Sequence, residues 1–567
     1  MRRRRFFRTV GAAGAGLWLG PAMAAGDGVA RPPGVAPFGK KSGPFDLVLR
    51  GGTVFDGTGA AGRKMDVGAV GDRIVAVGPG LARGTREIDV TGLAVAPGFI
   101  DIHSHADLSL FVNPRAESRI RQGVTTEVVG QDGGSVGPWS DEAWETVRDR
   151  YRSRFGVEIT FRDPVGFLDG IDRLKPAVNV ASMVGNGALR GLVIGQENRP
   201  AGEEELERMK SLLVRLLEGG CVGLSSGLEY TPSGFASTDE LAALAEVAAA
   251  RMCPYASHMR NEDDALLGAV EEALMVGRLS GVPVEVSHLK CQGRRNYWKT
   301  DAVLGLLREA RRAGVDVMYD VYPYTAYQTG LSNLFPTELR AGGTAAFLAR
   351  LAEPGTAAAM ERAARAKVAL LGDWNRIQIS SAREAWARGR RLGDLAAERG
   401  LDPYDLAVWL LRSNDGSVGM IGHGMGEESV ERLLADPLGM VCSDGGAYAP
   451  YGPLSESVPH PRGYGTFPRL LGRYVREKGV LDLPTAIHKI TGMPAGRLGF
   501  ADRGRIAEGA AADLVAFDPA TVEDRATFSN PHQYPVGIPV VVVNGVVTLV
   551  DGEHTGELGG QSVRREG

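Results

Sequence analysis

The chain is poor in cysteine, and its few cysteines form no recognisable pattern. There are four in 567 residues, Cys221, Cys253, Cys291 and Cys442, and no two are spaced as Cys-x-x-Cys. A disulfide-stabilised scaffold needs a dense and regular set of cysteines, so the sequence excludes that class. We expect each thiol to be a small buried side chain on or beside a strand.

Basic residues are not in excess either, once the first 25 residues are set apart. The chain has 64 Lys and Arg against 68 Asp and Glu, but residues 1–25 contain five Arg and no acidic residue. The remainder therefore has 59 basic and 68 acidic residues, a net charge of −9. A nucleic-acid-binding surface needs clustered cations that displace counterions from phosphates. We therefore expect a small-molecule substrate and no nucleic-acid partner.

No run is long and apolar enough to span a bilayer, and the one apolar stretch near the start is typical of a leader. Residues 1–25 open with arginines, continue with Ala, Gly and Leu, and close with Ala22-Met23-Ala24, the order of a signal peptide. Within them, Arg3-Arg4-Arg5-Phe6-Phe7-Arg8 resembles the twin-arginine export motif. We expect the twin-arginine export machinery as a partner, a periplasmic or secreted product, and no stable membrane anchor.

Length and composition allow one large core with an accessory domain, because the 567 residues are 44% hydrophobic. Short runs of Val, Ile and Leu, separated by Gly and Asp turns, fill residues 45–98. The same pattern of short apolar runs and turns recurs in residues 500–558. These are strand and hairpin signals, so we predict one small β-sandwich domain built from both ends of the chain.

The middle of the chain, residues 99–499, alternates short apolar strands with helical stretches, which predicts a parallel sheet. We expect strands near residues 99–104, 125–130, 178–184, 221–226, 253–258, 282–288, 316–322 and 438–444. Eight such units predict an α/β fold, a (β/α)8 TIM-type barrel. Roughly 115 residues separate the last two strands, too many for one crossover. Residues 330–420 are therefore predicted to be an insertion or lid.

Residues that can ligate a metal stand at the ends of four expected strands. His103 and His105 follow the first strand and lie on one face of it, because strand side chains alternate. His258, His288 and Asp444 follow three others. The carboxyl ends of barrel strands meet at one face. We therefore predict a zinc site at the mouth of the barrel, with one or two ions.

Several motifs of the sequence resemble those of a known family. Metal-ligand candidates in the order His-x-His, His, His, Asp follow Pro97-Gly98-Phe99-Ile100-Asp101, and this order resembles that of the amidohydrolase superfamily. Four further motifs resemble those of its N-acyl-D-amino-acid deacylase (D-aminoacylase) branch. These motifs are Gly223-Leu224-Ser225-Ser226-Gly227-Leu228-Glu229-Tyr230, the 30-residue step from His258 to His288, Tyr322-Pro323-Tyr324, and His460-Pro461-Arg462-Gly463-Tyr464-Gly465-Thr466-Phe467-Pro468-Arg469. The resemblance covers about residues 45–560. It implies zinc-dependent hydrolysis of N-acyl-D-amino acids, or of dipeptides with a C-terminal D-residue, to a free amino acid and a carboxylate.

Asp132 departs from this family, which has a zinc-binding cysteine at that position. The phrase here is Gln131-Asp132-Gly133. Aspartate also ligates zinc, so the resemblance implies one site formed by Asp132, His258 and His288. His103, His105 and Asp444 would line a second, more open site. A carboxylate is a harder ligand than a thiolate, so a change in metal affinity, metal preference or occupancy is expected. The alternative is that Asp132 is only a turn residue.

The resemblance also implies roles for residues around the metal. Asp444 is the expected general base and general acid, which takes a proton from the attacking water and returns it to the leaving nitrogen. Lys290 and Arg462 resemble the residues that bind the carboxylate of the substrate. Tyr322 or Tyr324 would add a hydroxyl donor.

Two other functions remain open at this stage. A cyclic-amide hydrolase or a deaminase of the same superfamily would use nearly the same ligands, but with less need of Lys290 and Arg462 together. A non-catalytic periplasmic binding protein, which has lost catalysis through the Asp132 change, would bind its ligand without turnover.

Overall fold

The computed structural model describes residues 44–565, which all lie in one compact unit. The predicted leader, residues 1–25 with its twin-arginine segment, lies outside the described residues. Among the described helices, none combines the length and the apolar character needed to cross a membrane.

Eight parallel strands, one of them interrupted, form the centre of the fold. They are β6 (Phe99–Asp101), β7 (Val124–Val129), β8 (Asn179–Ser182) with its continuation β9 (Val184–Gly185), β10 (Leu224–Gly227), β11 (Tyr255–His258), β12 (Val284–Val286), β13 (Val317–Val321) and β17 (Gly439–Val441). Each pairs in parallel with the next. Ser104, after β6, forms a parallel bridge with Gly445, after β17, which closes the ring. The strands thus form the (β/α)8 barrel that the sequence predicts.

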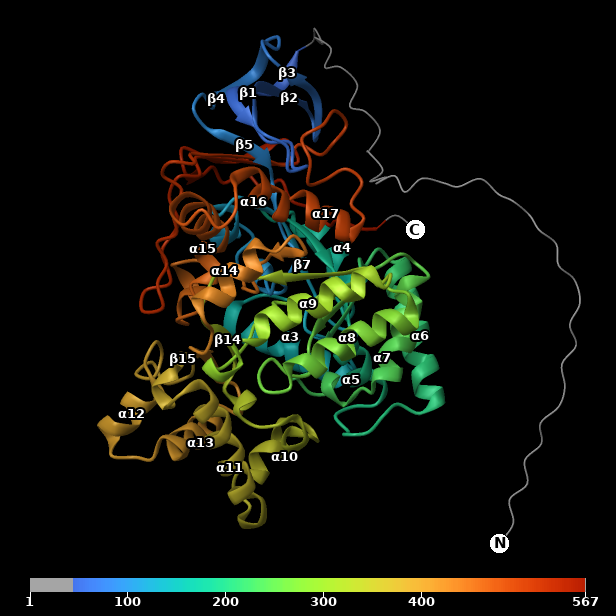
Figure 1. Cartoon of the computed structure of the whole chain (residues 1–567), viewed down its shortest axis with the longest axis vertical. Helices are drawn as coiled ribbons and strands as arrows, with labels where there is room; N and C mark the ends of the chain where they lie inside the picture. Colours follow the sequence, from blue (N-terminus) through green and yellow to red (C-terminus); the bar gives the residue numbers. More distant parts are fainter. Residues whose placement is uncertain (1–43, 566–567) are drawn as a thin grey trace, which may run out of the picture. The chain divides into compact units, whose positions relative to one another are not determined.

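Helices lie between these strands and after the last of them. They are α1 (Ser109–Val112), α2 (Glu117–Ile120), α3 (Asp141–Phe155), α4 (Pro164–Leu174), α5 (Asn186–Val193), α6 (Glu203–Glu218), α7 (Thr238–Ala249), α8 (Leu266–Ser280), α9 (Lys299–Arg312), α14 (Glu427–Ala435), α15 (Arg462–Arg469), α16 (Leu483–Lys489) and α17 (Gly492–Leu498). Helices α6 to α9, drawn in green, pack side by side in chain order (Figure 1). In α6, Met209, Leu213, Leu216 and Leu217 are the buried residues, at the spacing of one helix face.

The two ends of the chain meet in one continuous sheet. Its strands are β1 (Phe45–Val54), β2 (Arg63–Val70), β3 (Arg73–Gly78), β4 (Gly84–Asp89), β5 (Ala94–Pro97), β18 (Leu514–Phe517), β19 (Val540–Val543), β20 (Val546–Val550) and β21 (Glu553–His554). β18 pairs antiparallel with β5, which joins the C-terminal strands to the N-terminal ones. A core that includes Leu47, Val67, Leu514 and Val542 holds them together. Both termini thus build one sheet domain, where a small β-sandwich was predicted, and the exact domain limits stay predictions.

The long interval between β13 and β17 has secondary structure of its own. Its elements are β14 (Tyr327–Gly330), α10 (Gly343–Arg350), α11 (Pro354–Leu371), β15 (Ile377–Ser381), α12 (Leu392–Arg399), α13 (Pro403–Ser413) and β16 (Gly419–Gly422). The three strands pair antiparallel in the order β14-β16-β15. Helices α10 to α13 appear in yellow tones in Figure 1. An ion pair from Lys367 Nζ in α11 to Asp263 Oδ2, at 2.6 Å, ties this segment to the loop after β11.

A buried ion network lies where the barrel closes. Arg119, in α2, is fully buried and donates hydrogen bonds to Asp101 on β6 and to Glu127 on β7. The same guanidinium reaches the Ser443 hydroxyl after β17, at 2.6 Å. Three neighbouring strand positions are therefore held by one side chain, directly beside the residues that face the mouth of the barrel.

Candidate metal centre

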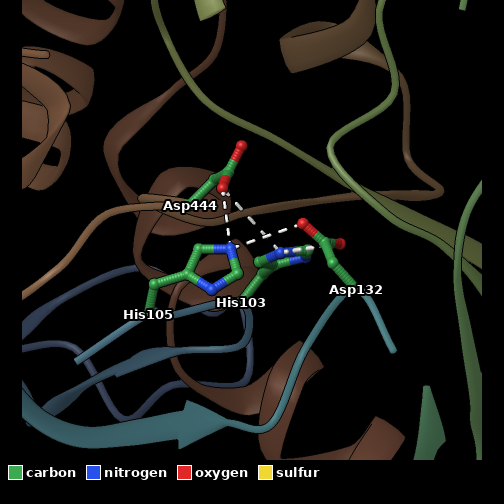
Figure 2. A group of neighbouring side chains, drawn as sticks. All are labelled: His103, His105, Asp132 and Asp444. Carbon is green, nitrogen blue, oxygen red and sulfur yellow. Dashed lines mark ion pairs between the residues drawn. The ribbon is translucent and has the colours of Figure 1, made fainter. Parts of the chain in front are cut away.

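Four predicted ligands from three strand ends point toward one another (Figure 2). His103 and His105 follow β6, Asp132 follows β7, and Asp444 follows β17. His105 Nε2 lies 3.2 Å from Asp444 Oδ1 and 3.4 Å from Asp132 Oδ2. His103 Nε2 lies 3.4 Å from Asp132 Oδ1. One ligand atom from each of the four residues lies within 4.8 Å of all the others, a spacing that a single metal ion can span.

A second group of ligand atoms shares Asp132 with the first. His258, at the end of β11, and His288, after β12, complete it with the same carboxylate. His288 Nε2 lies 3.3 Å from Asp132 Oδ1, and His258 Nδ1 lies 3.7 Å from Asp132 Oδ2. The two imidazoles are 2.8 Å apart, from His258 Nδ1 to His288 Nε2. Asp132 therefore contacts all four histidines and stands between two places for an ion.

The backbone turns sharply at three of these residues. Asp132, His288 and Asp444 have φ values of 53°, 34° and 48°, in the left-handed region. Such conformations cost on the order of 1–3 kcal/mol for residues other than glycine and gather at functional sites. Each of the three follows the end of a barrel strand, where the turn directs its side chain into the mouth of the barrel.

The donor set fits zinc. Nitrogen and oxygen atoms from histidine and aspartate are ordinary zinc ligands. Both ring nitrogens of His103 and Oδ1 of Asp132 are buried without a hydrogen-bond partner among the described residues. Buried polar atoms in this state are costly, and a cation would satisfy those that face the centre.

The charges of the centre are strongly perturbed. Burial opposes protonation of His105, yet the Asp132 and Asp444 carboxylates raise its pKa to about 9. Burial opposes protonation of His258 too, but Glu262 and Asp132 raise its pKa to about 10. Burial favours the neutral form of Asp444, whereas Arg462 and the histidines hold its pKa below the ordinary range. A metal would replace the protons on these imidazoles, so its binding releases protons.

A cavity of about 660 Å³ opens over the centre. Its volume lies in the range of small-molecule sites. Besides the ligands, its walls include Lys290, Tyr322, Arg462 and Glu229, and residues 327–330 from the segment around β14. The segment between β13 and β17 therefore contributes directly to the wall of the site.

Three of the four predicted substrate-binding residues line this cavity. Lys290 Nζ lies 2.6 Å from Glu262 Oε1, and Arg462 Nη1 donates to Asp444 Oδ2 at 2.7 Å. The Arg462 guanidinium stacks over the Tyr322 ring at 4.8 Å. Tyr324 does not belong to the cavity wall that the described residues form. Its hydroxyl donates to the main-chain oxygen of Pro461 at 3.5 Å, so its place is behind the wall.

Three acidic residues near the centre were not expected from the sequence. Glu262 Oε1 lies 3.1 Å from His288 Nδ1, and Asp320 accepts a hydrogen bond from the main-chain N–H of His288 at 2.8 Å. Glu229 Oε2 lies 3.5 Å from His258 Nε2. Glu229 and Asp320 lie at the ends of β10 and β13, so the rule that found the histidines would also have found these two carboxylates.

The chain is similar to known proteins along most of its length. Residues 86–549 match the model of the amidohydrolase family. The D-aminoacylase of Alcaligenes xylosoxydans xylosoxydans is 37% identical over 526 residues, which cover 92% of this chain and 98% of the relative. The N-acyl-D-glutamate deacylase of the same organism is 38% identical over 510 residues, 88% of this chain and 93% of the relative.

A solved structure is similar as well. It is an N-acyl-D-glutamate deacylase from Bordetella bronchiseptica, complexed with zinc and with a phosphonate inhibitor that mimics the tetrahedral intermediate of the reaction. The TM-score is 0.77 at 34% identity, and the match covers 92% of this chain and 100% of the other.

Proposed function

The chain belongs to the amidohydrolase family, and on that premise we propose that it hydrolyses N-acyl-D-amino acids, or dipeptides with a C-terminal D-residue, to a free amino acid and a carboxylate. The observation that carries the proposal is the shared ligand. Asp132 lies between two groups of metal-ligating atoms at the floor of a cavity that also presents Lys290 and Arg462.

Zinc is the metal that the donor set and the zinc-complexed relative support. The residues that would hold it are Asp132, His258 and His288 in one group, and His103, His105, Asp132 and Asp444 in the other. When bound, zinc supplies a Lewis acid that activates water and polarises the scissile carbonyl.

Asp444 moves the proton. Its Oδ2 accepts a hydrogen bond from Arg462, whereas Oδ1 faces His105 at 3.2 Å. Oδ1 is therefore the atom that accepts the proton of the attacking water. The same oxygen returns that proton to the nitrogen of the breaking C–N bond, so that the amine leaves uncharged.

Lys290 and Arg462 orient the substrate through its carboxylate. Both cations lie in the wall of the cavity and are buried, with 2% and 4% of their surface exposed. A buried cation binds an anion more strongly than an exposed one, because water screens the interaction less. Arg462 uses Nη1 for Asp444, which leaves the rest of its planar fork for the substrate.

The test is amine release from paired N-acetyl-D- and N-acetyl-L-amino acids and from L,D-dipeptides, with protein of known zinc content. We expect zinc-dependent turnover of the D-substrates and at least a 100-fold loss in Asp444→Asn, since general acid–base catalysis contributes about 10²–10⁴-fold. Zinc-loaded protein that hydrolyses none of these substrates would contradict the proposal. Ligand binding without turnover would favour the binding-protein alternative.

We propose further that residues 1–25 direct export through the twin-arginine machinery and that the product is periplasmic or secreted. The support is the order of charged, apolar and small residues in that segment. Arg3→Lys combined with Arg4→Lys should retain the protein in the cytoplasmic fraction. Unchanged export of that double variant would contradict the proposal.

A further inference from the structure

One carboxylate of the cavity, outside the two ligand groups described above, forms no ion pair with a lysine or an arginine of the described chain. Glu229 follows β10 and lines the cavity over the metal centre. Two other acidic side chains there have strong partners, since Glu262 pairs with Lys290 at 2.6 Å and Asp444 pairs with Arg462 at 2.7 Å. Glu229 has no comparable partner among residues 44–565, although only 14% of its side chain is exposed.

The Glu229 carboxylate forms no ion pair with a lysine or an arginine of the described residues. Within the part of the chain that the structure describes, the one polar contact of its carboxylate is His258 Nε2, at 3.5 Å. A histidine that ligates a metal is neutral and leaves the carboxylate charge in place.

Two cations nearby are engaged with other groups. Lys367 Nζ lies 2.6 Å from Asp263 Oδ2. Arg340 donates from Nη1 to the Asn333 side chain and from Nη2 to the main-chain oxygen of Glu229, so these bonds do not reach the carboxylate. The Glu229 carboxylate therefore lines the cavity without a direct cation partner, while Lys367 and Arg340 act on it through space.

The barrel places Glu229 across the centre from Asp444 and Arg462. In the ring that begins at β6, β10 is the fourth position and β17 is the eighth. Positions four apart in a closed ring of eight lie on opposite sides. Asp444 follows β17 and holds Arg462 at 2.7 Å. A substrate whose carboxylate is bound at Arg462, and whose amide lies at the metal centre, therefore directs its acyl group toward Glu229.

We propose that Glu229 selects acyl groups that carry an ammonium on the carbon next to the scissile carbonyl. The preferred substrates would then be aminoacyl-D-amino acids, dipeptides with a free amino terminus, rather than N-acetyl-D-amino acids. An ammonium forms charge-assisted hydrogen bonds with the carboxylate, whereas a neutral acyl group leaves it buried and unpaired. This inference rests on the proposed function, because it requires cleavage of the amide at this centre.

The test compares glycyl-D-leucine with N-propionyl-D-leucine, which differ only in an ammonium in place of a methyl group. Wild type should favour the glycyl substrate in kcat/KM by about tenfold or more, the factor that a charge-assisted hydrogen bond supplies. Glu229→Gln should lose this preference, measured as the ratio of kcat/KM for the two substrates. The matched control is Glu338→Gln, because Glu338 lines the neighbouring cavity but not the one over the centre, and its preference should stay unchanged.

Other results would overturn the assignment. Equal kcat/KM for the two substrates in wild type contradicts it without any variant. An equal loss on both substrates in Glu229→Gln, with the preference kept and zinc content lowered, would give Glu229 the role of holding His258. A Glu229-dependent preference for N-acetyl-D-lysine over N-acetyl-D-norleucine, without one in the first pair, would place the ammonium on the leaving amino acid. If the zinc-loaded protein hydrolyses no D-substrate, the proposed function itself is contradicted, not only the role of Glu229.

Discussion

The sequence left open whether Asp132 is a turn residue or a metal ligand, and the structure is compatible with both roles at once. It has the left-handed backbone of a turn residue, with φ 53°, in a segment that contains Gly130 and Gly133. Its carboxylate nevertheless lies within 3.3–3.7 Å of nitrogen atoms of all four histidines. Aspartate is one of the few residues that tolerate this backbone, so the turn and the ligand position are compatible in one residue.

Asp132→Asn should bind zinc at least about tenfold more weakly than wild type, because an amide carries no charge and donates where the centre needs an acceptor. Asp132→Cys should keep zinc and lose affinity for manganese, since a thiolate is the softer ligand. Competition with a chelator of known affinity measures both effects. Zinc affinity equal to wild type in Asp132→Asn would leave Asp132 with the turn role alone.

Lys489, in α16, carries a buried ammonium that takes no part in the metal centre. Its Nζ donates to the main-chain oxygens of Asp436 and Gly439. Burial lowers the pKa of Lys489 from 10.5 to about 8, and the Asp436 carboxylate offsets only part of that effect. The cost of burying this charge is therefore fully present below pH 8 and absent once the unfolded chain has also lost the proton.

The free energy of unfolding should rise with pH between about 8 and 10.5 through Lys489. In that window the unfolded chain binds the proton that the folded protein has lost, so stability increases with pH. Relative to Lys489→Met, wild type should gain up to about 3 kcal/mol across the window. Urea unfolding of both proteins at about pH 7.5 and at about pH 10 measures the difference. Parallel pH curves for the two proteins would contradict the shifted pKa.

At the scale of elements, the barrel strands were predictable, and so was a long segment before the last strand, but the internal structure of that segment was not. Each expected barrel strand overlaps an observed one, because a strand buried on both faces is a short apolar run in any context. The insertion strands β14, β15 and β16 pair antiparallel across long stretches of chain. Such pairing depends on partners that local periodicity does not identify. The pairing of Lys290 with Glu262 was missed for the same reason, since the two residues lie in different loops.

Arg119→Met should destabilise the protein by about 3–5 kcal/mol, the usual cost of removing one partner from a buried ion network. The substitution leaves Asp101 and Glu127 buried without their cation, at the place where the barrel closes. Arg152→Met is the matched control, because this arginine is 58% exposed in a surface pair with Asp149 and should change stability by less than about 1 kcal/mol. Chemical unfolding of both variants gives the comparison, and equal stability of the two would contradict the role of Arg119.

At the scale of the whole molecule, the sequence predicted that both ends of the chain build one small β-sandwich domain, but not where the last residues bind. Residues after β21 continue to the barrel and form main-chain hydrogen bonds there. Val180 on β8 donates to Gln561 at 2.9 Å, and Val563 donates to Val180 at 2.8 Å. This segment has no strong apolar periodicity, so nothing local in it identifies the barrel as its partner.

Gly560 allows this docking, and its substitution should loosen the C-terminal segment. A Cβ at this position would lie 2.1 Å from the main-chain oxygen of Val178, and main chain cannot move aside as a flexible side chain does. Gly560→Ala should therefore lower the melting temperature, in the same direction as a truncation after Leu558. Gly496→Ala in α17 is the control, because a Cβ there meets nothing within 4 Å and alanine favours a helix. Thermal unfolding of the three variants decides the point: if Gly560→Ala and the truncation melt with wild type, the segment adds no stability to the barrel.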